Sequence, residues 1–415
     1  MMRKIFVSLA AWLLAAACVG VNGHRTLSPG EWRGVLTRAD GVSVPFNFAV
    51  GDTLGKKVIW IQNGAGRLLV DSLRYGGDTA FIHMPFFNGH FTALVQPDGS
   101  LEGRYTRSGP DSSRSMAFRA YPGVTYRMTA RPAPALRNVT GRWAVQFTGA
   151  TGQPGPRAVG EFHQNGSRVS GTFLTRSGDY RYLEGVMTAD TLLLSGFDGS
   201  HIFLFRAVAA SDTTLTGGEF YWGFDGRSTW QAYRDTAASL PDAFSLTTFN
   251  PREDQLDFTF PDIHGKPVSI RDSVFRGKVV IVQIMGSWCP NCMDETAFLS
   301  PWYNRNKSRD VAVIGLCYEL PTDFHRAVEN VLTFKKRFDI TYPLLITGVQ
   351  PSDPDLLKKT LPQLDHFVGF PTTIFVNRKG DIARVHAGFS GPGTGEHYQA
   401  FIREFNHLVD SLAAE

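Results

Sequence analysis

Two cysteines separated by two residues are the part of this sequence best suited to chemistry. The segment 286–292, Gly-Ser-Trp-Cys-Pro-Asn-Cys, follows the apolar run from Val279 to Met285 and opens a stretch compatible with a helix. A thiol in the first turn of a helix is stabilised as a thiolate by unpaired N–H groups and by the helix dipole. A cysteine three positions later lies one turn further along the same face. The spacing therefore predicts thiol–disulfide exchange, with Cys289 as the exposed attacking thiol and Cys292 as the more buried resolving thiol.

Two other interpretations of this cysteine pair stay open. A zinc site would need a second pair of ligands at a matching spacing, and no such pair accompanies Cys317. A purely structural disulfide is the second alternative. Cys317 itself lies in an apolar run and is predicted to be an inert core thiol. We expect neither a metal nor another cofactor.

The elements that must position the pair alternate between strands and helices. The patterns predict strands over 279–285, 311–317, 342–346, 372–377 and 382–386, and helices over 289–304, 323–338 and 396–412. This order predicts an α/β sheet with helices on its faces. Thr394 is expected to cap the last helix. Residues 347–368 form a polar insertion, which either borders the substrate groove or decorates an edge of the sheet.

The segment from about residue 257 to 415 resembles the TlpA-like (ResA-like) branch of the thioredoxin superfamily. The residues that carry the resemblance are Gly265-Lys266, Gly277-Lys278, the segment 288–292, Glu295 and Phe370-Pro371-Thr372. The resemblance implies an α/β thioredoxin fold in which Pro371 is cis and faces the cysteine pair. It also implies that Phe370 presents its backbone to a substrate chain.

Two further side chains beside the pair receive roles at this stage. The resemblance makes Glu295 a partly buried acid that tunes or relays protons, whereas the alternative is a favourable acid in an early helical turn. Asp294 is expected to face solvent. Trp288 is predicted to shield the thiols, and ordinary packing is the alternative.

The function that the resemblance implies is a thiol–disulfide oxidoreductase acting on the thiols and disulfides of other proteins. In the TlpA-like family the reductant is typically a membrane electron-transfer protein of the DsbD type, which favours reduction of protein disulfides. A thiol peroxidase is a lesser alternative, because peroxiredoxins place Thr where Gly286 stands. A binding or scaffold protein, with the thioredoxin fold as a redox switch, is the competing class.

The start of the chain carries the pattern of an export signal. Arg3 and Lys4 precede an apolar run from Ile5 to Ala17, which is shorter than the roughly 20 residues that span a bilayer. The sequence before Cys18 resembles a bacterial lipoprotein box, although Ala15 stands where Leu is usual. We therefore expect a signal peptide over 1–17, a lipid anchor on Cys18 and a location on the periplasmic side of the bacterial cell envelope. An ordinary signal peptide with an incidental Cys18 is the alternative.

Residues 24 to about 235 show alternating strand patterns that occur twice. Trp32 corresponds to Trp143, His90 to His201, and the segment 118–120 to 230–232, each about 110 residues apart. These matches predict an all-β region with a duplicated unit, folded as two similar units or as one larger barrel or sandwich. The region is not recognised as any known family. Its matched histidines are predicted to be turn or core residues.

Composition sets the outer limits of this interpretation. The chain has 415 residues with 43% hydrophobic and 19% charged residues, which excludes wholesale disorder. A formal net charge of +4 spread along the chain argues against nucleic acid as a partner. The predicted organisation is multidomain, with β units over 24–122 and 139–234, a linker over 235–254 and a thioredoxin-like domain over 255–415.

Overall fold

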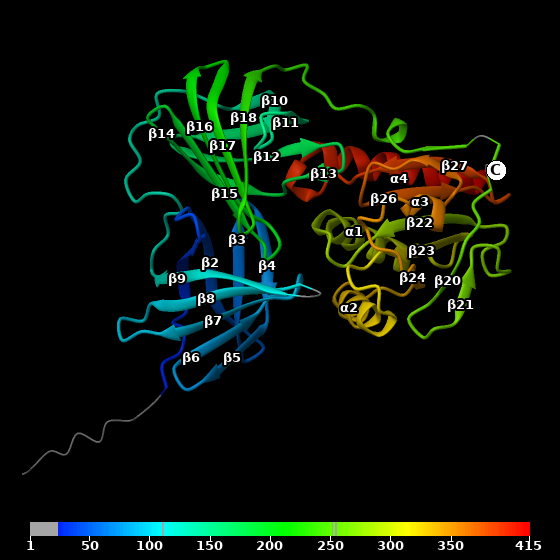
Figure 1. Cartoon of the computed structure of the whole chain (residues 1–415), viewed down its shortest axis with the longest axis horizontal. Helices are drawn as coiled ribbons and strands as arrows, with labels where there is room; N and C mark the ends of the chain where they lie inside the picture. Colours follow the sequence, from blue (N-terminus) through cyan, green and yellow to red (C-terminus); the bar gives the residue numbers. More distant parts are fainter. Residues whose placement is uncertain (1–23, 110–111, 251, 254) are drawn as a thin grey trace, which may run out of the picture.

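The computed structural model describes residues 24–415 except 110, 111, 251 and 254. Two nine-stranded sheets, built from consecutive halves of the N-terminal region, precede a five-stranded sheet with helices. Figure 1 shows the two β units stacked on one another beside the C-terminal α/β domain. Cys18 and the predicted leader lie outside the described residues. Within the described part of the chain, no helix is both long and apolar enough to cross a membrane.

The first β unit is an antiparallel sheet whose first strand pairs with its last. Its order is β4-β3-β2-β1-β9-β8-β7-β6-β5, so the edge strands β4 and β5 are neighbours in sequence. Inward-facing residues alternate along the strands, as in β9, and fill one hydrophobic core. The strands are β1 Gly30–Thr37, β2 Ser43–Thr53, β3 Lys56–Asn63, β4 Gly66–Val70, β5 Ser72–Gly76, β6 Thr79–His83, β7 Gly89–Val95, β8 Leu101–Ser108 and β9 Ser113–Pro122.

The second β unit repeats this topology and closes on itself. Its order is β11-β10-β18-β17-β16-β15-β14-β12-β13, and an additional pairing of β11 with β12 closes a barrel-like sheet. The two units are therefore separate sheets and not halves of one larger barrel. The strands are β10 Gly141–Thr148, β11 Pro154–Asn165, β12 Arg168–Thr175, β13 Gly178–Asp179, β14 Leu183–Thr188, β15 Thr191–Phe197, β16 Ile202–Ser211, β17 Thr214–Trp222 and β18 Gly226–Arg234.

The matched tryptophans show how closely the two units correspond. Trp32 on β1 and Trp143 on β10 are both fully buried. The indole of Trp32 donates to the carbonyl of Ser28 at 3.0 Å, and that of Trp143 donates to the carbonyl of Val139 at 2.9 Å. Each bond reaches back four residues across the start of the strand. The same side chain thus closes the same end of both sheets.

The C-terminal domain is built on a mixed sheet of order β24-β23-β22-β26-β27. β22, β23 and β24 are parallel, and the hairpin of β26 and β27 adds two antiparallel strands. All seven residues of β22 are buried, as expected for a central strand covered on both faces. The main elements are β22 Val279–Met285, α1 Pro290–Asn306, β23 Val311–Cys317, α2 Phe324–Arg337, β24 Leu344–Ile346, β26 Thr372–Val376, β27 Ile382–Ala387 and α4 Glu396–Ala414.

Residues of β22 point alternately into two hydrophobic clusters. Val279, Ile281 and Met285 join a cluster formed by the helices α1, α2 and α4. Val280, Val282 and Ile284 join the opposite cluster, which residues 256–275 and the inserted segment cover. The predicted strands and helices of this domain are confirmed to within a few residues. The predicted cap on α4 is wrong, because Gly395 is the N-cap and the Thr394 hydroxyl donates to Gly391.

The linker and the polar insertion pack on the domain together. β19 (Thr248–Phe249) pairs with β25 (Leu364–His366) of the insertion. The insertion also carries α3 (Leu356–Thr360), and it contributes buried leucines to the core. The remaining short elements are η1 Ala243–Ser245, β20 Thr259–Pro261, β21 Pro267–Ser269 and η2 Pro392–Thr394. The insertion therefore supports the domain from one face of its sheet.

Candidate functional site

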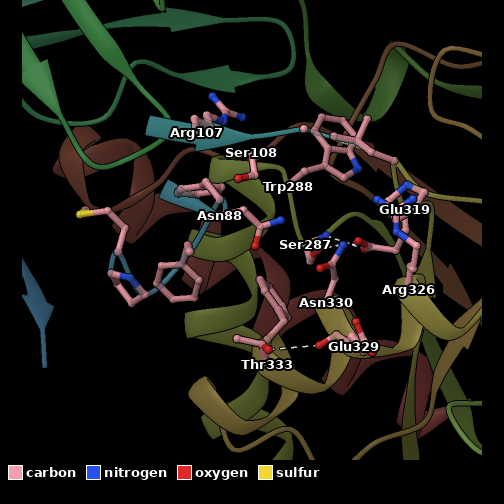
Figure 2. Close-up of a pocket in the computed structure, with 18 of the residues that line it drawn as sticks. Asn88, Arg107, Ser108, Ser287, Trp288, Glu319, Arg326, Glu329, Asn330 and Thr333 are labelled. Carbon is pink, nitrogen blue, oxygen red and sulfur yellow. Dashed lines mark hydrogen bonds between the residues drawn. The ribbon is translucent and has the colours of Figure 1, made fainter. Parts of the chain in front are cut away.

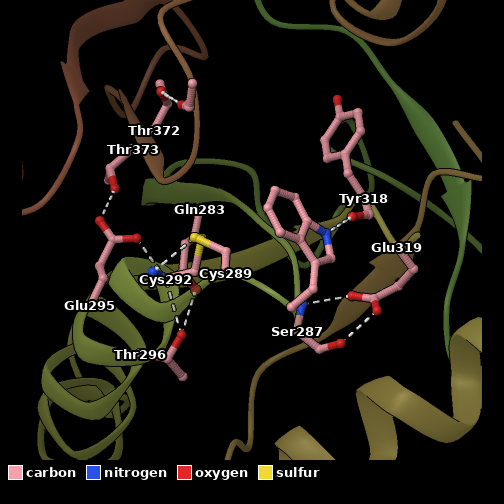
Figure 3. Close-up of a disulfide and its surroundings, with 12 residues drawn as sticks. Gln283, Ser287, Cys289, Cys292, Glu295, Thr296, Tyr318, Glu319, Thr372 and Thr373 are labelled. Carbon is pink, nitrogen blue, oxygen red and sulfur yellow. Dashed lines mark hydrogen bonds between the residues drawn. A yellow bond between two sulfur atoms is a disulfide. The ribbon is translucent and has the colours of Figure 1, made fainter. Parts of the chain in front are cut away.

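The cysteine pair forms a disulfide at the first turn of α1 (Figure 3). Cys289 is the N-cap residue in extended conformation, Pro290 occupies the first helical position, and Cys292 follows one turn later. The backbone N–H of Cys292 donates to the sulfur of Cys289 at 3.1 Å. This N–H would stabilise negative charge on Cys289 in the reduced protein, as would the helix dipole.

Both cysteines are buried, which corrects the prediction that Cys289 is exposed. The exposed fraction is 4% for Cys289 and 0% for Cys292. The physical reason is that Cys289 packs in the hydrophobic cluster of the C-terminal domain. A turn of the second β unit also lies against the neighbouring Asn291, because a Cβ atom added to Gly178 would lie 1.9 Å from its side-chain nitrogen. A prediction made from the C-terminal segment alone could not include this second contact.

The peptide bond between Phe370 and Pro371 is cis, as the family resemblance implied. Pro371 is buried at the start of β26, next to the central strand β22. The ring of Phe370 lies 5.3 Å from the indole of Trp288, in an edge-to-face arrangement. The indole N–H of Trp288 donates to the carbonyl of Tyr318 at 2.7 Å. Trp288 and Phe370 therefore form one aromatic wall beside the disulfide.

Glu295 points from α1 into the interior, between the strands β22 and β26. Its carboxylate accepts from Gln283 at 2.7 Å and from the hydroxyl of Thr373. Burial raises the pKa of Glu295 to about 7, although both hydrogen bonds lower it. This geometry is that of a buried acid and not of an exposed acid in an early helical turn. Such a carboxyl group can take up or release a proton near neutral pH.

Glu319 is a second buried acid, which the sequence reasoning missed. Its two oxygens accept from the backbone N–H and the hydroxyl of Ser287, at 2.8 and 2.5 Å (Figure 3). Burial raises the pKa of Glu319 above its usual value. The sequence did contain a signal for Glu319, because this residue comes just after the strand β23. Polar residues that follow parallel strands gather at one edge of the sheet. The two hydrogen bonds between Glu319 and Ser287 hold the loop that carries Trp288.

Asp294 does not face solvent, contrary to the prediction. Its carboxylate binds the guanidinium of Arg181 at 2.7 Å, and 12% of the side chain is exposed. Arg181 lies in the second β unit, so this ion pair joins two parts of the chain far apart in sequence. Burial raises the pKa of Asp294 to about 6, whereas Arg181 lowers it.

A cavity of about 630 Å³ opens beside Trp288, between the first β unit and the C-terminal domain. Figure 2 shows Asn88, Arg107 and Ser108 on one side, with Ser287 and Glu319 on the other. The N-terminal region therefore lines space next to Ser287 and Trp288, which directly precede Cys289.

Cys317 and the matched histidines take no part in this geometry. Cys317 is free and fully buried, and burial raises its pKa well above the usual value. His201 is held by Asp198 at 3.0 Å, and His90 lies opposite His83 on neighbouring strands. Residues 24–415, apart from the four undescribed positions, contain no group of three or more His, Cys, Asp or Glu side chains placed to hold a metal ion.

A Cys-x-x-Cys disulfide at a helix N-terminus, on this sheet and beside a cis-proline, defines a thioredoxin-like oxidoreductase domain. Residues 251–385 match the family model described as AhpC/TSA family.

Two curated relatives of the C-terminal segment carry the name thiol-disulfide oxidoreductase. The thiol-disulfide oxidoreductase ResA of Halalkalibacterium halodurans is 25% identical over 158 residues, which are 38% of this chain and 76% of that protein. ResA of Bacillus thuringiensis is 32% identical over 90 residues, which are 22% of this chain and 47% of that protein. The match thus spans about half the length of the second relative. A thioredoxin-family thiol:disulfide interchange protein from Chlorobium tepidum has 20% identity and a TM-score of 0.29, with 41% of this chain and 98% of that one covered.

Proposed function

We propose that the chain reduces disulfides of other proteins through the dithiol of Cys289 and Cys292, on the outer side of a bacterial membrane. The observation that carries this proposal is the disulfide at the first turn of α1, where a thiolate is stabilised. The export signal over 1–17 and a lipid anchor at Cys18 belong to the proposal. Trp288, Phe370 and Pro371 would contact the substrate chain.

The reaction proceeds by two thiol–disulfide exchanges. The thiolate of Cys289 attacks one sulfur of the substrate disulfide, which forms a mixed disulfide and releases one substrate thiolate. The thiolate of Cys292 then attacks the sulfur of Cys289, which releases the second substrate thiolate and leaves the Cys289–Cys292 disulfide. Two electrons pass to the substrate, whose two thiolates take up protons. In this scheme Glu295 accepts the proton that the Cys292 thiol loses.

The cycle requires a reductant for the resulting disulfide. We propose a membrane dithiol protein of the DsbD type, which would reduce the enzyme by the same two exchanges in reverse order. Electrons would then flow from the donor through Cys289 and Cys292 to the substrate. A reduction potential as oxidising as that of known strong protein oxidants, roughly −120 mV, would reverse the proposed direction.

Replacement of Cys292 by Ser tests this proposal. The variant keeps the attacking thiol and lacks the resolving thiol, so mixed disulfides through Cys289 should accumulate in cells and survive non-reducing electrophoresis. The matched control is Cys317→Ser, which removes a buried thiol and should trap nothing above the wild type. Absence of trapped partners, together with insulin reduction no faster than in Cys289→Ser, would contradict the proposal.

One observation favours a second candidate function. Residues of the first β unit line the cavity beside Trp288, so the N-terminal region could bind a partner whose affinity depends on the redox state of the disulfide. If the wild type reduces insulin no faster than Cys289→Ser, this binding function becomes the better explanation.

A further inference from the structure

A turn of the second β unit reaches across to the C-terminal domain. We name residues 176–182, between β12 and β14, the lobe. Figure 1 shows the end of the second sheet at β12 and β13 reaching toward α1 and α4. The lobe is held in shape by a bond from the hydroxyl of Thr175 to the carbonyl of Gly178 at 2.9 Å. The N–H of Arg181 also donates to Asp179 at 2.6 Å.

The tip of the lobe rests on the cysteine segment. A Cβ atom added to Gly178 would lie 1.9 Å from the side-chain nitrogen of Asn291, the residue between Pro290 and Cys292. Gly178 has φ +147°, a conformation that favours glycine. A side chain at position 178 would therefore force the Asn291 side chain or the lobe to shift.

The same lobe touches the other wall of the site. A Cβ atom on Gly388 would lie 2.8 Å from the carbonyl carbon of Ser177, and one on Gly369 would lie 3.7 Å from the Cβ of Ser177. The backbone N–H of Gly388 donates to the carbonyl of Pro371 at 2.8 Å, so Gly388 lies beside the cis-proline turn. The lobe thus spans the space between Asn291 and the cis-proline turn.

Two polar contacts fasten the lobe in this position. Arg181 donates to Asp294 at 2.7 Å and to Asp198 of its own unit at 2.8 Å. Asp179, which is 2% exposed, accepts from the backbone N–H of Gly391 at 2.8 Å. An ion pair and a hydrogen bond, both shielded from solvent, therefore join the lobe to α1 and to the loop before α4.

We propose that the lobe is an autoinhibitory contact: it occupies the groove in which a substrate chain must reach Cys289, and substrate enters only when the lobe moves away. This inference rests on the proposed function, because it takes the space between Asn291 and the cis-proline turn as the substrate groove. The lobe then reduces the fraction of molecules able to bind a polypeptide, and the apparent affinity falls by the same fraction.

The test compares variants that weaken the lobe contact from either side. Gly178→Leu places a side chain where Asn291 lies, and Asp294→Asn removes the charge that holds Arg181. Gly166→Leu is the matched control, because Gly166 has φ +59° in the β11–β12 turn and no atom lies within 4 Å of its added Cβ. Each reduced protein is labelled with a maleimide carrying a large polyethylene glycol, and the label on Cys289 is followed by mass spectrometry.

We expect both lobe variants to react about tenfold faster than the wild type, with Gly166→Leu unchanged. The rate of insulin reduction should also increase in both lobe variants and stay unchanged in Gly166→Leu. Equal labelling of wild type and both variants would overturn the proposal, and if Gly178→Leu does not fold, Asp294→Asn alone decides. Faster labelling without insulin reduction in any protein would keep the lobe as a cover and reject the proposed reductase function.

Discussion

At the scale of single residues, burial without a neighbouring positive charge determines the pKa of Glu295, the buried acid of α1. Glu295 is 2% exposed, and its hydrogen-bond partners, Gln283 and Thr373, are neutral. The desolvation cost of the carboxylate is therefore only partly offset, and its pKa rises to about 7. Because the raised pKa favours the protonated form, Glu295 stabilises the fold fully below pH 4.5 and loses that contribution as pH rises through about 7.

Glu295→Gln should remove this pH dependence, so the difference in free energy of unfolding between variant and wild type should change with pH. The free energy of unfolding of the variant, relative to wild type, should rise by roughly 2 kcal/mol between pH 5 and pH 8. Urea unfolding of the oxidised proteins at both values measures it. Glu404→Gln, on the exposed side of α4, is the control and should leave the difference near zero. A difference for Glu295→Gln that does not change with pH would show that Glu295 titrates outside this range.

The residues that the sequence located are those whose role depends on local spacing. The cysteine pair follows from two positions three apart at a strand–helix junction, and Pro371 follows from a motif at the start of a strand. Asp294 was wrongly predicted to face solvent and Glu319 was missed, because the partners of both residues come from distant segments. Arg181 lies 113 residues before Asp294, and Ser287 lies 32 residues before Glu319. Spacing along the chain does not identify such partners, although the place of Glu319 just after β23 indicated the edge of the sheet at which it lies.

At the scale of elements, a favoured residue just before a helix does not by itself show whether the helix is capped. Both Asp323 and Asp355 precede a helix, and Asp residues are favoured N-caps. Only Asp323 caps: its carboxylate accepts from the N–H of Arg326 at 3.0 Å, whereas Asp355 makes no side-chain cap bond. A β-region backbone at Asp323 turns the side chain back onto the helix, and Asp355 lacks that conformation.

The difference predicts unequal costs for the same substitution. Asp323→Ala removes the cap of α2 and should lower the free energy of unfolding by about 1 kcal/mol. Asp355→Ala is the matched control and should lower it by no more than a few tenths of a kcal/mol. Chemical denaturation followed by circular dichroism measures both. Equal losses in the two variants would mean that charge near the helix start, and not the cap bond, provides the stabilisation.

At the scale of the whole molecule, the three parts contact one another through specific polar bonds. Arg337 on α2 donates to the carbonyl of Leu69 at 3.0 Å, which ties the first β unit to the C-terminal domain. His397 at the start of α4 lies 2.9 Å from Glu161 of the second unit. The sequence predicted the parts but not these joints, because the bonds connect residues 268 and 236 positions apart.

Arg127 is a buried arginine that forms polar bonds to both β units. Arg127, in the segment between β9 and β10, is 5% exposed. Its guanidinium donates to the carbonyl of Gln62 at 2.6 Å on the first sheet and to Glu184 at 3.4 Å on the second. Arg168 pairs with the same Glu184 at 3.0 Å, but 81% of its side chain is exposed. The two arginines share one acid and differ in burial.

Arg127→Met should therefore cost about 3 kcal/mol of unfolding free energy, since it leaves the carbonyl of Gln62 without this buried donor and Glu184 without its inner partner. Arg168→Met is the matched control and should cost no more than about 0.5 kcal/mol, because solvent screens the exposed pair. Denaturant unfolding followed by tryptophan fluorescence, to which the buried Trp32 and Trp143 of the two sheets contribute, measures both costs. A small cost for Arg127→Met, or equal costs for the two variants, would show that the other contacts between the two sheets hold them together without this arginine.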